Sequence, residues 1–290
     1  MLAKPLKTIH RLRSAVLGIN ERNLDYIYRF NPRRFYNLAD DKFITKSILE
    51  QKGIACPKTY GVISKIGDIE PVWYQVQHHE KVVIKPAKGR GGGGILVLKK
   101  KEGEWYASGK VITTDQIFSH IANVVFGIYS IGDQDKAIIE ECVIPHPFFG
   151  EIYPAGVPDL RVIMFENKAV MAMLRMPTER SDGKANIHQG GLGIGIDIKS
   201  GRLTRVYDGK RFYMTHPDNG HQITGLPLPY WKAILELSLD TSKAFPLDYL
   251  GVDIVIDRQK GPMVMEINVR PGLAIQIANQ KGLKEVLKSA

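Results

Sequence analysis

The residues best suited to chemistry lie near the C-terminus, in two consecutive strand-like runs at 252–257 and 262–268. An antiparallel hairpin of these runs places Asp253 opposite Glu266 and puts Asn268 on the same face as Glu266. Two opposed carboxylates repel each other unless a cation lies between them. Carboxylate and amide oxygens are the ligands that Mg²⁺ prefers. The pattern predicts a site for Mg²⁺ or Mn²⁺, and the alternative is the exposed face of a polar hairpin.

A second candidate is a lysine at the end of an apolar strand, followed by a run of glycines. Lys85 ends the strand 82–85 with no partner evident in the sequence, so a phosphate would neutralise it. The glycines that follow allow backbone N–H groups to approach phosphate oxygens: Gly91, Gly92, Gly93 and Gly94. The loop is not a Walker loop, because no Gly-Lys-Ser/Thr follows. A flexible hairpin tip is the alternative interpretation.

Three further segments carry polar groups in strand-like surroundings. The run 137–143 is apolar but contains Glu140 and Glu141, which suits either a cleft that binds adenine and ribose or a structural role. Asp159 and Arg161 alternate along a strand, so they share a face and pair with each other or with a charged ligand. The polar loop 182–191 includes His188, whose type is more often a solvated loop residue than a catalytic one.

These residues require a mixed set of helices and strands to position them. A helix is expected over 40–52 with Asp40 as its N-cap, and another over 229–244. A hairpin is expected at 160–173 with its turn at 166–168. The C-terminal hairpin is expected to close with residue 257 opposite 262. The order is not a regular βαβ alternation, so a plain Rossmann fold is disfavoured.

Composition and charge limit the class of protein. The chain has 290 residues, a size that favours one domain of two lobes, and two cysteines, too few for a disulfide scaffold. No apolar run is long enough to span a membrane, so a cytoplasmic protein is expected. The net charge is +10, and residues 1–34 hold eight cations against two acids. This basic leader could bind nucleic acid, an anionic membrane surface or an acidic protein, or could be a solvated helix face.

In their order along the chain, these pieces resemble the ATP-grasp carboxylate–amine ligases, above all the RimK-type and alpha-L-glutamate ligase-like proteins. The resemblance covers roughly residues 40 to 290. It is carried by Asp41-Lys42, by Lys85 before the glycines, by Glu140-Glu141, Asp159-Leu160-Arg161 and Asn186–Gly191, and by Gly251–Asp253 and Met265–Asn268 followed by Pro271-Gly272.

The resemblance implies a role for each matching position. Asp253, Glu266 and Asn268 would hold Mg²⁺ that bridges the phosphates of ATP. Lys85 would contact the phosphates, with Gly91–Gly94 as a lid over them. The other nucleotide contacts that it implies are Lys42, Glu140, Glu141, Cys142, Asp159, Lys184 and Asn186. Arg161 and Arg270 would handle charge on the acylphosphate or acceptor, although Arg270 stands where the most similar ligases have a small residue.

The implied fold is the α+β ATP-grasp fold, in which two α/β lobes clasp the nucleotide. Residues 1–39 would form a short basic helical extension, 40–139 the first lobe and 140–290 the second. The implied activity is an ADP-forming ligation of an amino acid or small carboxylate to an amine acceptor, such as a peptide or protein, through an acylphosphate. A kinase on the same fold is one alternative. A basic nucleic-acid-binding protein is the other, but the opposed acids would repel phosphate.

Overall fold

The structure is a computed structural model that describes residues 15–89, 91–130 and 132–288. Contacts divide the chain into two compact units. Unit 1 comprises Met1–Ala39, Leu49–Ala55 and Ile144–Ala290, and unit 2 comprises Asp40–Ile48 and Cys56–Val143. Of the expected N-terminal extension, residues 1–14 lie outside the described part. In the described ranges, no helix is both long and apolar enough to span a membrane.

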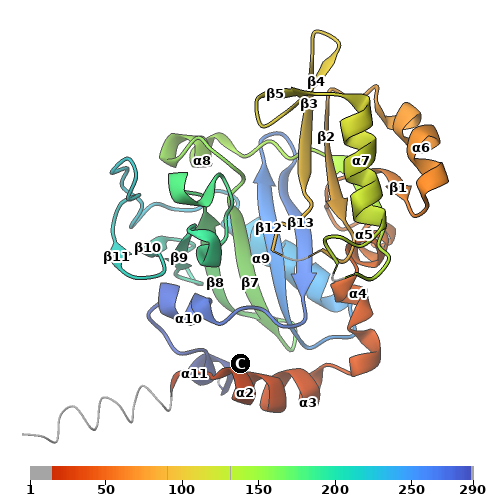
Figure 1. Ribbon diagram of the computed structural model, residues 1–290. Coiled ribbons are helices and arrows are strands. Elements are labelled where there is room, and N and C mark those ends of the chain that lie inside the picture. The colour runs from red at the N-terminus through yellow and green to blue at the C-terminus, as the bar shows by residue number, and fades with distance from the viewer. Residues whose placement is uncertain (1–14, 90, 131, 289–290) are drawn as a thin grey trace, which may run out of the picture. The chain divides into compact units, whose positions relative to one another are not determined.

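Unit 2 is built on a six-stranded antiparallel sheet in the order β1-β6-β2-β3-β4-β5 (Figure 1). The strands are β1 Thr59–Ile63, β2 Lys81–Pro86, β3 Leu96–Lys101, β4 Glu104–Ala107, β5 Lys110–Ile112 and β6 Ala137–Glu141. A short 3₁₀ turn η3 (Ile66–Asp68) precedes helix α6 (Ile69–Val76), and α7 (Thr114–Val125) follows β5. Apolar side chains of both helices and of the sheet form one core around Trp73, Ile84, Leu98 and Ile121. The strand expected at 82–85 is confirmed as β2.

The expected helix over 40–52 is present, but its cap is not Asp40. A short helix α4 (Asn37–Asp40) ends there, and α5 spans Lys42–Gln51. The carboxylate of Asp41 accepts hydrogen bonds from the N–H groups of Phe43 at 2.9 Å and Ile44 at 3.2 Å. These are two of the donors that the first turn of a helix leaves unsatisfied, so Asp41 is the residue that starts α5.

Unit 1 contains a seven-stranded antiparallel sheet in the order β11-β10-β9-β8-β7-β12-β13 (Figure 1). The strands are β7 Asp159–Phe165, β8 Lys168–Met176, β9 Leu192–Ile196, β10 Leu203–Tyr207, β11 Phe212–Tyr213, β12 Tyr249–Asp257 and β13 Gly261–Asn268. The predicted hairpin of β7 and β8 is confirmed. Its turn residues Glu166 and Asn167 both have positive φ, 46° and 62°, as tight hairpins require.

The hairpin of β12 and β13 closes one residue earlier than expected. Asp257 pairs with Gly261, not with Pro262. A β-bulge then shifts the register between Asp253 and Ile254, so that Asp253 does pair with Glu266. The extra residue in β13 offsets the shorter turn. The predicted opposition of the two acids is therefore confirmed, although the expected uninterrupted register was wrong.

Short helices complete unit 1. A helical run formed by α2 (Ile19–Glu21), the π-helical η1 (Arg22–Ile27) and α3 (Tyr28–Phe30) leads to the 3₁₀ turn η2 (Arg33–Phe35). The others are α8 Pro147–Ile152, η4 Glu179–Ser181, η5 Ile187–Gln189, α9 Trp231–Ala244, α10 Ala274–Ala278 and α11 Leu283–Lys288. Figure 1 shows α9, the helix expected over 229–244, running behind β7, β12 and β13.

Candidate active site

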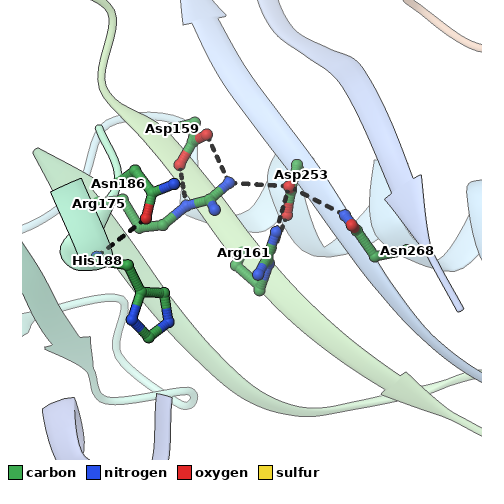
Figure 2. Close-up of polar contacts among 7 residues, drawn as sticks. All are labelled: Asp159, Arg161, Arg175, Asn186, His188, Asp253 and Asn268. Atoms are coloured by element: carbon green, nitrogen blue, oxygen red, sulfur yellow. Dashed lines mark hydrogen bonds and ion pairs between the residues drawn. The ribbon is translucent and has the colours of Figure 1, made fainter. Parts of the chain in front are cut away.

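One face of the sheet in unit 1 gathers charged residues into a row, and all of them except Arg175 were predicted from the sequence. Asp159 pairs with Arg175 of β8, Arg161 pairs with Asp253, and Asp253 pairs with Glu266. Directly opposed residues of antiparallel strands point to the same face, so five charged side chains from four strands converge. Figure 2 shows Asp159, Arg161, Arg175 and Asp253 directed toward one another.

The four charged groups of β7, β8 and β12 are joined by paired hydrogen bonds. The Nε and Nη2 atoms of Arg161 donate to the two carboxylate oxygens of Asp253 at 2.8 and 2.6 Å. Arg175 donates in the same way to Asp159, at 2.5 and 2.6 Å, and its Nη2 also reaches Asp253 Oδ2 at 2.8 Å. Each arginine therefore holds a carboxylate with both arms of its fork, which fixes the planes of both groups. Asp159 and Arg161 share a face as predicted, but each pairs with a residue of another strand.

The two aspartates have opposite shifts in pKa. Burial alone would raise the pKa of Asp253, but Arg161 and Arg175 lower it to about 2, so this carboxylate is ionised at any physiological pH. The pKa of Asp159 rises to about 6, because burial and then the charge of Asp253 outweigh the attraction of Arg175. Their common neighbour Arg175 has a raised pKa, since both carboxylates favour its charged form against the effect of burial.

β12 and β13 carry oxygen donors that could hold a divalent cation, although the described residues contain no group of three or more His, Cys, Asp or Glu side chains placed to bind one. Asn268 donates its amide N–H to Asp253 Oδ2 at 3.1 Å, which leaves its carbonyl oxygen as an acceptor. Oδ1 of Asp253 accepts only the bond from Arg161 among the hydrogen bonds of the described residues, so it keeps a lone pair. With Glu266, three hard oxygens of the kind that Mg²⁺ selects lie on one hairpin. Three carboxylates and two guanidinium groups leave the cluster with one net negative charge.

Loop 182–191 is ordered by Asn186. Its side-chain oxygen accepts the N–H of His188 at 3.0 Å, and its carbonyl accepts the N–H of Gly191 at 2.8 Å. These bonds form η5, and Figure 2 shows the one between Asn186 and His188. The N–H of Lys184 bonds to the carbonyl of Ser181 at 3.1 Å, at the start of the same loop.

In the described part of the chain, Arg270 contacts an aromatic ring and not the acidic residue that binds Arg161. Its guanidinium group stacks over the ring of Tyr36, 4.9 Å from the ring centroid, and the residue is exposed. It makes no ion pair with Asp159 or Asp253 among the salt bridges of the described residues. The structure therefore joins Arg161 to the acidic cluster and places Arg270 at an aromatic contact instead.

In unit 2, Lys85 is buried and has a partner, so the expectation that it lacks one was wrong. Its Nζ atom lies 2.7 Å from Oε1 of Glu140, and Lys46 of α5 binds the other oxygen of the same carboxylate. All three residues are 5% exposed or less. Burial alone would raise the pKa of Glu140, but Lys85 and then Lys46 lower it. Burial lowers the pKa of Lys46 despite Glu140. With all three groups ionised, the triad has a net charge of +1.

The other nucleotide contacts predicted for unit 2 lie within a few positions of Lys46, Lys85 or Glu140 along the chain. Lys42, the first residue of α5, donates to the carbonyl of Gly89 at 2.7 Å and so ties the helix to the glycine loop. In that loop Gly91, Gly92 and Gly94 have positive φ, which only glycine adopts without strain. The N–H of Glu141 bonds to the carbonyl of Lys58, and Cys142 follows at the end of β6.

Two residues of these clusters were missed by sequence reasoning. The strand predicted before Arg175 ended at Met173, two residues too early to include it. Lys46 lies within the predicted helix, but only the apolar residues of that helix were assigned to its buried face. Their partners are distant along the chain, since Arg175 and Asp253 are 78 positions apart and Lys46 and Glu140 are 94 apart. The one available signal was charge type, because a cation in an apolar strand needs a buried acid.

A pocket of about 450 Å³ lies beside loop 182–191 in unit 1. Ile187 forms one wall and rests on Gly193 of β9, where an added Cβ would meet its Cδ1 atom at 2.6 Å. Gly193 pairs with Arg175, so the pocket opens on the same face of the sheet as the charged row. The lining combines apolar side chains with two cations and one acid: Ile187, Tyr207, Ala274, Ile277, Arg180, Lys210 and Asp208.

Comparison with protein families gives a match to sugar-transfer associated ATP-grasp proteins over residues 21–290. The chain belongs to this family. The ATP-grasp family predicted from the motifs is thereby confirmed. Enzymes of the ATP-grasp ligase class use ATP and Mg²⁺.

Curated relatives include proteins named probable alpha-L-glutamate ligase. One from Pseudoalteromonas translucida (strain TAC 125) is 25% identical over 258 residues, which are 89% of this chain and 64% of the relative. One from Coxiella burnetii (strain Dugway 5J108-111) is 26% identical over 233 residues, which are 80% of this chain and 56% of the relative. This chain therefore spans less than two thirds of the length of these relatives.

Solved structures confirm the fold. A biotin carboxylase–ATP complex from Campylobacter jejuni superimposes with a TM-score of 0.54 at 12% identity, over 87% of this chain and 46% of that chain. D-cycloserine synthetase DcsG gives 0.50 at 12% identity, over 90% and 73%. The α+β ATP-grasp fold predicted from the sequence is confirmed, with one antiparallel sheet in each unit.

Proposed function

We propose that this chain is an ADP-forming ligase that joins a carboxylate to an amine through an acylphosphate. The observation that carries the proposal is the row of Asp159, Arg161, Arg175, Asp253 and Glu266 on one sheet face of an ATP-grasp unit. The row combines fixed cations for a developing anion with hard oxygens for a metal. It contains no nucleophile of the Ser-His-Asp or Cys-His kind, and acylphosphate chemistry requires none.

The proposed reaction has two steps. An oxygen of the substrate carboxylate attacks the γ-phosphorus of ATP, the bond to the β-phosphate oxygen breaks, and ADP leaves. The amine of the acceptor then attacks the acyl carbon, loses a proton and expels inorganic phosphate, which leaves an amide. Both steps depend on positioning and on neutralisation of charge rather than on covalent help from the protein.

The charged row of unit 1 supplies groups for both requirements. Arg161 and Arg175 are oriented by Asp253 and Asp159, so their outward N–H groups can meet an acylphosphate with little reorganisation. Asp253, Glu266 and Asn268 would hold Mg²⁺, or Mn²⁺, which would withdraw charge from the phosphates. One divalent cation changes the charge of the row from −1 to +1, which suits an anionic ligand.

The nucleotide residues proposed for unit 2 centre on the buried triad. Lys46 and Lys85 share one carboxylate, so the triad can accept an anion. We assign Lys85 to the ATP phosphates, with Lys42 and the glycines Gly91–Gly94 as further phosphate contacts and with Glu141 and Cys142 as backbone contacts of adenine. Glu140 acts here through Lys85, because its carboxylate positions the ammonium group.

The pocket beside loop 182–191 is the proposed site of the acceptor. Its apolar walls and its two cations, Arg180 and Lys210, favour an amphipathic acid such as an amino acid or a peptide end. Arg180 donates to two backbone carbonyls, those of Gly190 and Asp208, and the carboxylate of Asp208 also lines the pocket. Two cations against this one acid leave the lining with a net charge of +1. Acidic acceptors should therefore be used in preference to basic ones.

The experiment is a pairwise scan of amino acids and short peptides with Mg²⁺ and ATP, followed by ADP release and by mass spectrometry of the product. We expect ADP formation that requires both substrates and yields an amide.

In Glu266→Gln, turnover should fall at least a hundredfold, which is about 3 kcal/mol of transition-state stabilisation. The matched control Glu236→Gln removes an exposed acid of α9 and should leave turnover unchanged.

The outcome separates the ligase from the kinase alternative. A phosphorylated product that accumulates with no amide would favour the kinase. Near-normal turnover in folded Glu266→Gln would contradict the metal assignment. Salt-sensitive binding of RNA without ATP turnover would favour the nucleic-acid-binding alternative.

A further inference from the structure

The helical run Ile19–Phe30 is fixed to unit 1 by one face. Leu17, just before it, is buried, and its N–H and C=O groups bond to the side chain of Gln276 at 2.8 and 3.1 Å. Arg22 is buried and donates to the carbonyl of Pro271 at 2.8 Å. Tyr26 and Phe30 pack edge-on against Phe165, with ring centroids 5.6 and 4.9 Å away. The orientation of this run is therefore set by specific contacts.

The opposite face of the run exposes large apolar side chains. The exposed fractions are 64% for Ile19, 63% for Leu24 and 59% for Tyr28, with Val16 at 45% just before the run. Leu24 and Tyr28 are four positions apart, so they are neighbours on one side of a helix. We call these four residues the outer stripe. These four side chains do not hold the run against unit 1, because the contacts of Leu17, Arg22, Tyr26 and Phe30 already do so.

The segments that carry or adjoin the outer stripe expose more cations than acids, although exposed Asp25 lies next to Leu24. Arg29, Arg33 and Arg34 are exposed, and Arg29 and Arg34 lie over the rings of Phe30 and Phe35. Helix α11 lies beside the run in Figure 1, and Lys284 of α11 pairs with Glu21 at 2.5 Å. Two exposed lysines lie at the ends of this helix: Lys288 is its last residue, and Lys281 comes two residues before its start.

We propose that this surface binds the headgroup region of an anionic lipid bilayer. Exposed aliphatic side chains and a tyrosine, bordered by arginines and lysines, match the pattern of a helix that lies in the membrane interface. The apolar residues would enter the boundary of the acyl chains, and the cations would meet lipid phosphates. A nucleic acid would satisfy the cations but would leave Ile19 and Leu24 without apolar contacts, so lipid accounts for both observations.

The test is co-sedimentation of the full chain with vesicles of phosphatidylcholine and phosphatidylglycerol, and with vesicles of phosphatidylcholine alone. We expect binding to the anionic vesicles that weakens with added salt, and little binding to the neutral ones. The triple variant Ile19→Ser, Leu24→Ser, Tyr28→Ser should lose roughly tenfold or more in affinity for anionic vesicles. The matched control is Tyr74→Ser, Phe126→Ser, Ile128→Ser, which removes equally exposed residues of unit 2 and should bind like the wild type.

A charge-reversal pair tests the cations independently. Arg33→Glu with Arg34→Glu should weaken binding and reduce its salt dependence, whereas Lys99→Glu with Lys101→Glu, on an exposed strand of unit 2, should not. Circular dichroism verifies that each variant is folded. The proposal is overturned if the wild type does not bind anionic vesicles, or if the outer-stripe variant and its control bind equally. It is also overturned if an RNA oligonucleotide binds this surface while the vesicles do not.

Discussion

Arg175 binds two carboxylates, those of buried Asp253 and partly exposed Asp159. It contacts both oxygens of Asp159 and one oxygen of Asp253. Without this guanidinium group, two acids on the same sheet face would lose their shared counter-charge. Arg175 therefore has a structural role in the row in addition to the proposed contact with the acylphosphate.

We expect Arg175→Met to lower the free energy of unfolding by roughly 2–3 kcal/mol, because Asp159 loses both of its hydrogen bonds from a guanidinium group and Asp253 keeps only those from Arg161. Urea denaturation followed by circular dichroism measures the change. Arg205→Met is the matched control, since Arg205 is an exposed arginine on β10 of the same sheet, and its loss should change the stability by less than about 0.5 kcal/mol. Equal stability of Arg175→Met and the wild type would contradict the role given to Arg175.

His216 is a buried histidine whose two ring nitrogens both have backbone partners. Nε2 lies 3.1 Å from the carbonyl of Pro177, and Nδ1 accepts the N–H of Asp218 at 3.3 Å. The ring stacks on Tyr153 with the centroids 4.4 Å apart. An Nδ1 that accepts a bond cannot carry a proton, so the folded state requires the neutral ring.

The stability of the protein should depend on the protonation of His216. Burial lowers its pKa in the folded state, below the ordinary value of 6.5 that the unfolded chain keeps. Between the two pKa values only the unfolded chain binds the proton, so the stabilisation is complete above pH 6.5 and is lost as the pH falls below it. Urea titrations between about pH 5 and 7 should show a smaller loss of stability in His216→Gln than in the wild type. Identical pH profiles would show that His216 does not contribute.

At the scale of secondary-structure elements, β9 depends on two glycines. Gly193 lies under the side chain of Ile187, and Gly195 lies under the backbone of α10. Both face the same side of the sheet as Arg175, because Gly193 pairs with Arg175 and Gly195 is two residues further along. These glycines therefore set how closely loop 182–191 and α10 approach the charged row.

The two glycines should respond differently to alanine. At Gly195 a Cβ would meet Thr204 Oγ1 at 2.4 Å and the carbonyl oxygen of Ala278 at 2.6 Å, and this backbone cannot yield easily. We expect Gly195→Ala to cost roughly 1–3 kcal/mol of stability. Gly193→Ala should cost less, because only the end of the Ile187 side chain must move. Gly150→Ala, in α8 with nothing near the new methyl, is the control and should be neutral or stabilising. The reverse order of Gly193 and Gly195 in melting experiments would contradict this packing.

The strands and the family were predictable from local patterns, whereas the pairing of charges was not. Apolar runs in the sequence predicted the strands β2, β7, β12 and β13. The assumption that the last two form an antiparallel hairpin predicted that Asp253 lies opposite Glu266. A turn one residue shorter and a compensating bulge in β13 leave no mark in the alternation of apolar residues, so the closing pair was missed. The partner of Lys85 was missed because Glu140 joins it only through the pairing of β2 with β6.

At the scale of the whole chain, nucleotide binding should appear as thermal stability. A ligand that binds only the folded state raises the melting temperature. Mg²⁺ and ATP should raise it clearly in the wild type, but hardly in Lys85→Met, which should lose roughly 2–5 kcal/mol of binding free energy. Lys81→Met removes an exposed lysine from the same strand and should keep the full shift.

In Lys85→Met the remaining pair, Lys46 and Glu140, is electrically balanced, so this variant should still fold without ligand. Equal thermal shifts in Lys85→Met and Lys81→Met would refute the assignment of Lys85 to the phosphates. The glycine loop would then be the flexible hairpin tip that the sequence also allowed.

The central claim is that the carboxylate is activated as an acylphosphate, and oxygen transfer tests this most directly. The carboxylate substrate identified in the scan is labelled with ¹⁸O and incubated with ATP, Mg²⁺ and the acceptor amine, and the released phosphate is analysed by mass spectrometry. The attacking carboxylate oxygen becomes the bridging oxygen of the acylphosphate and leaves with the phosphorus. One phosphate that carries a single ¹⁸O atom should therefore be released for each amide formed. Unlabelled phosphate released in step with ADP would mean that water or another group attacks the nucleotide, and it would contradict the proposed ligation.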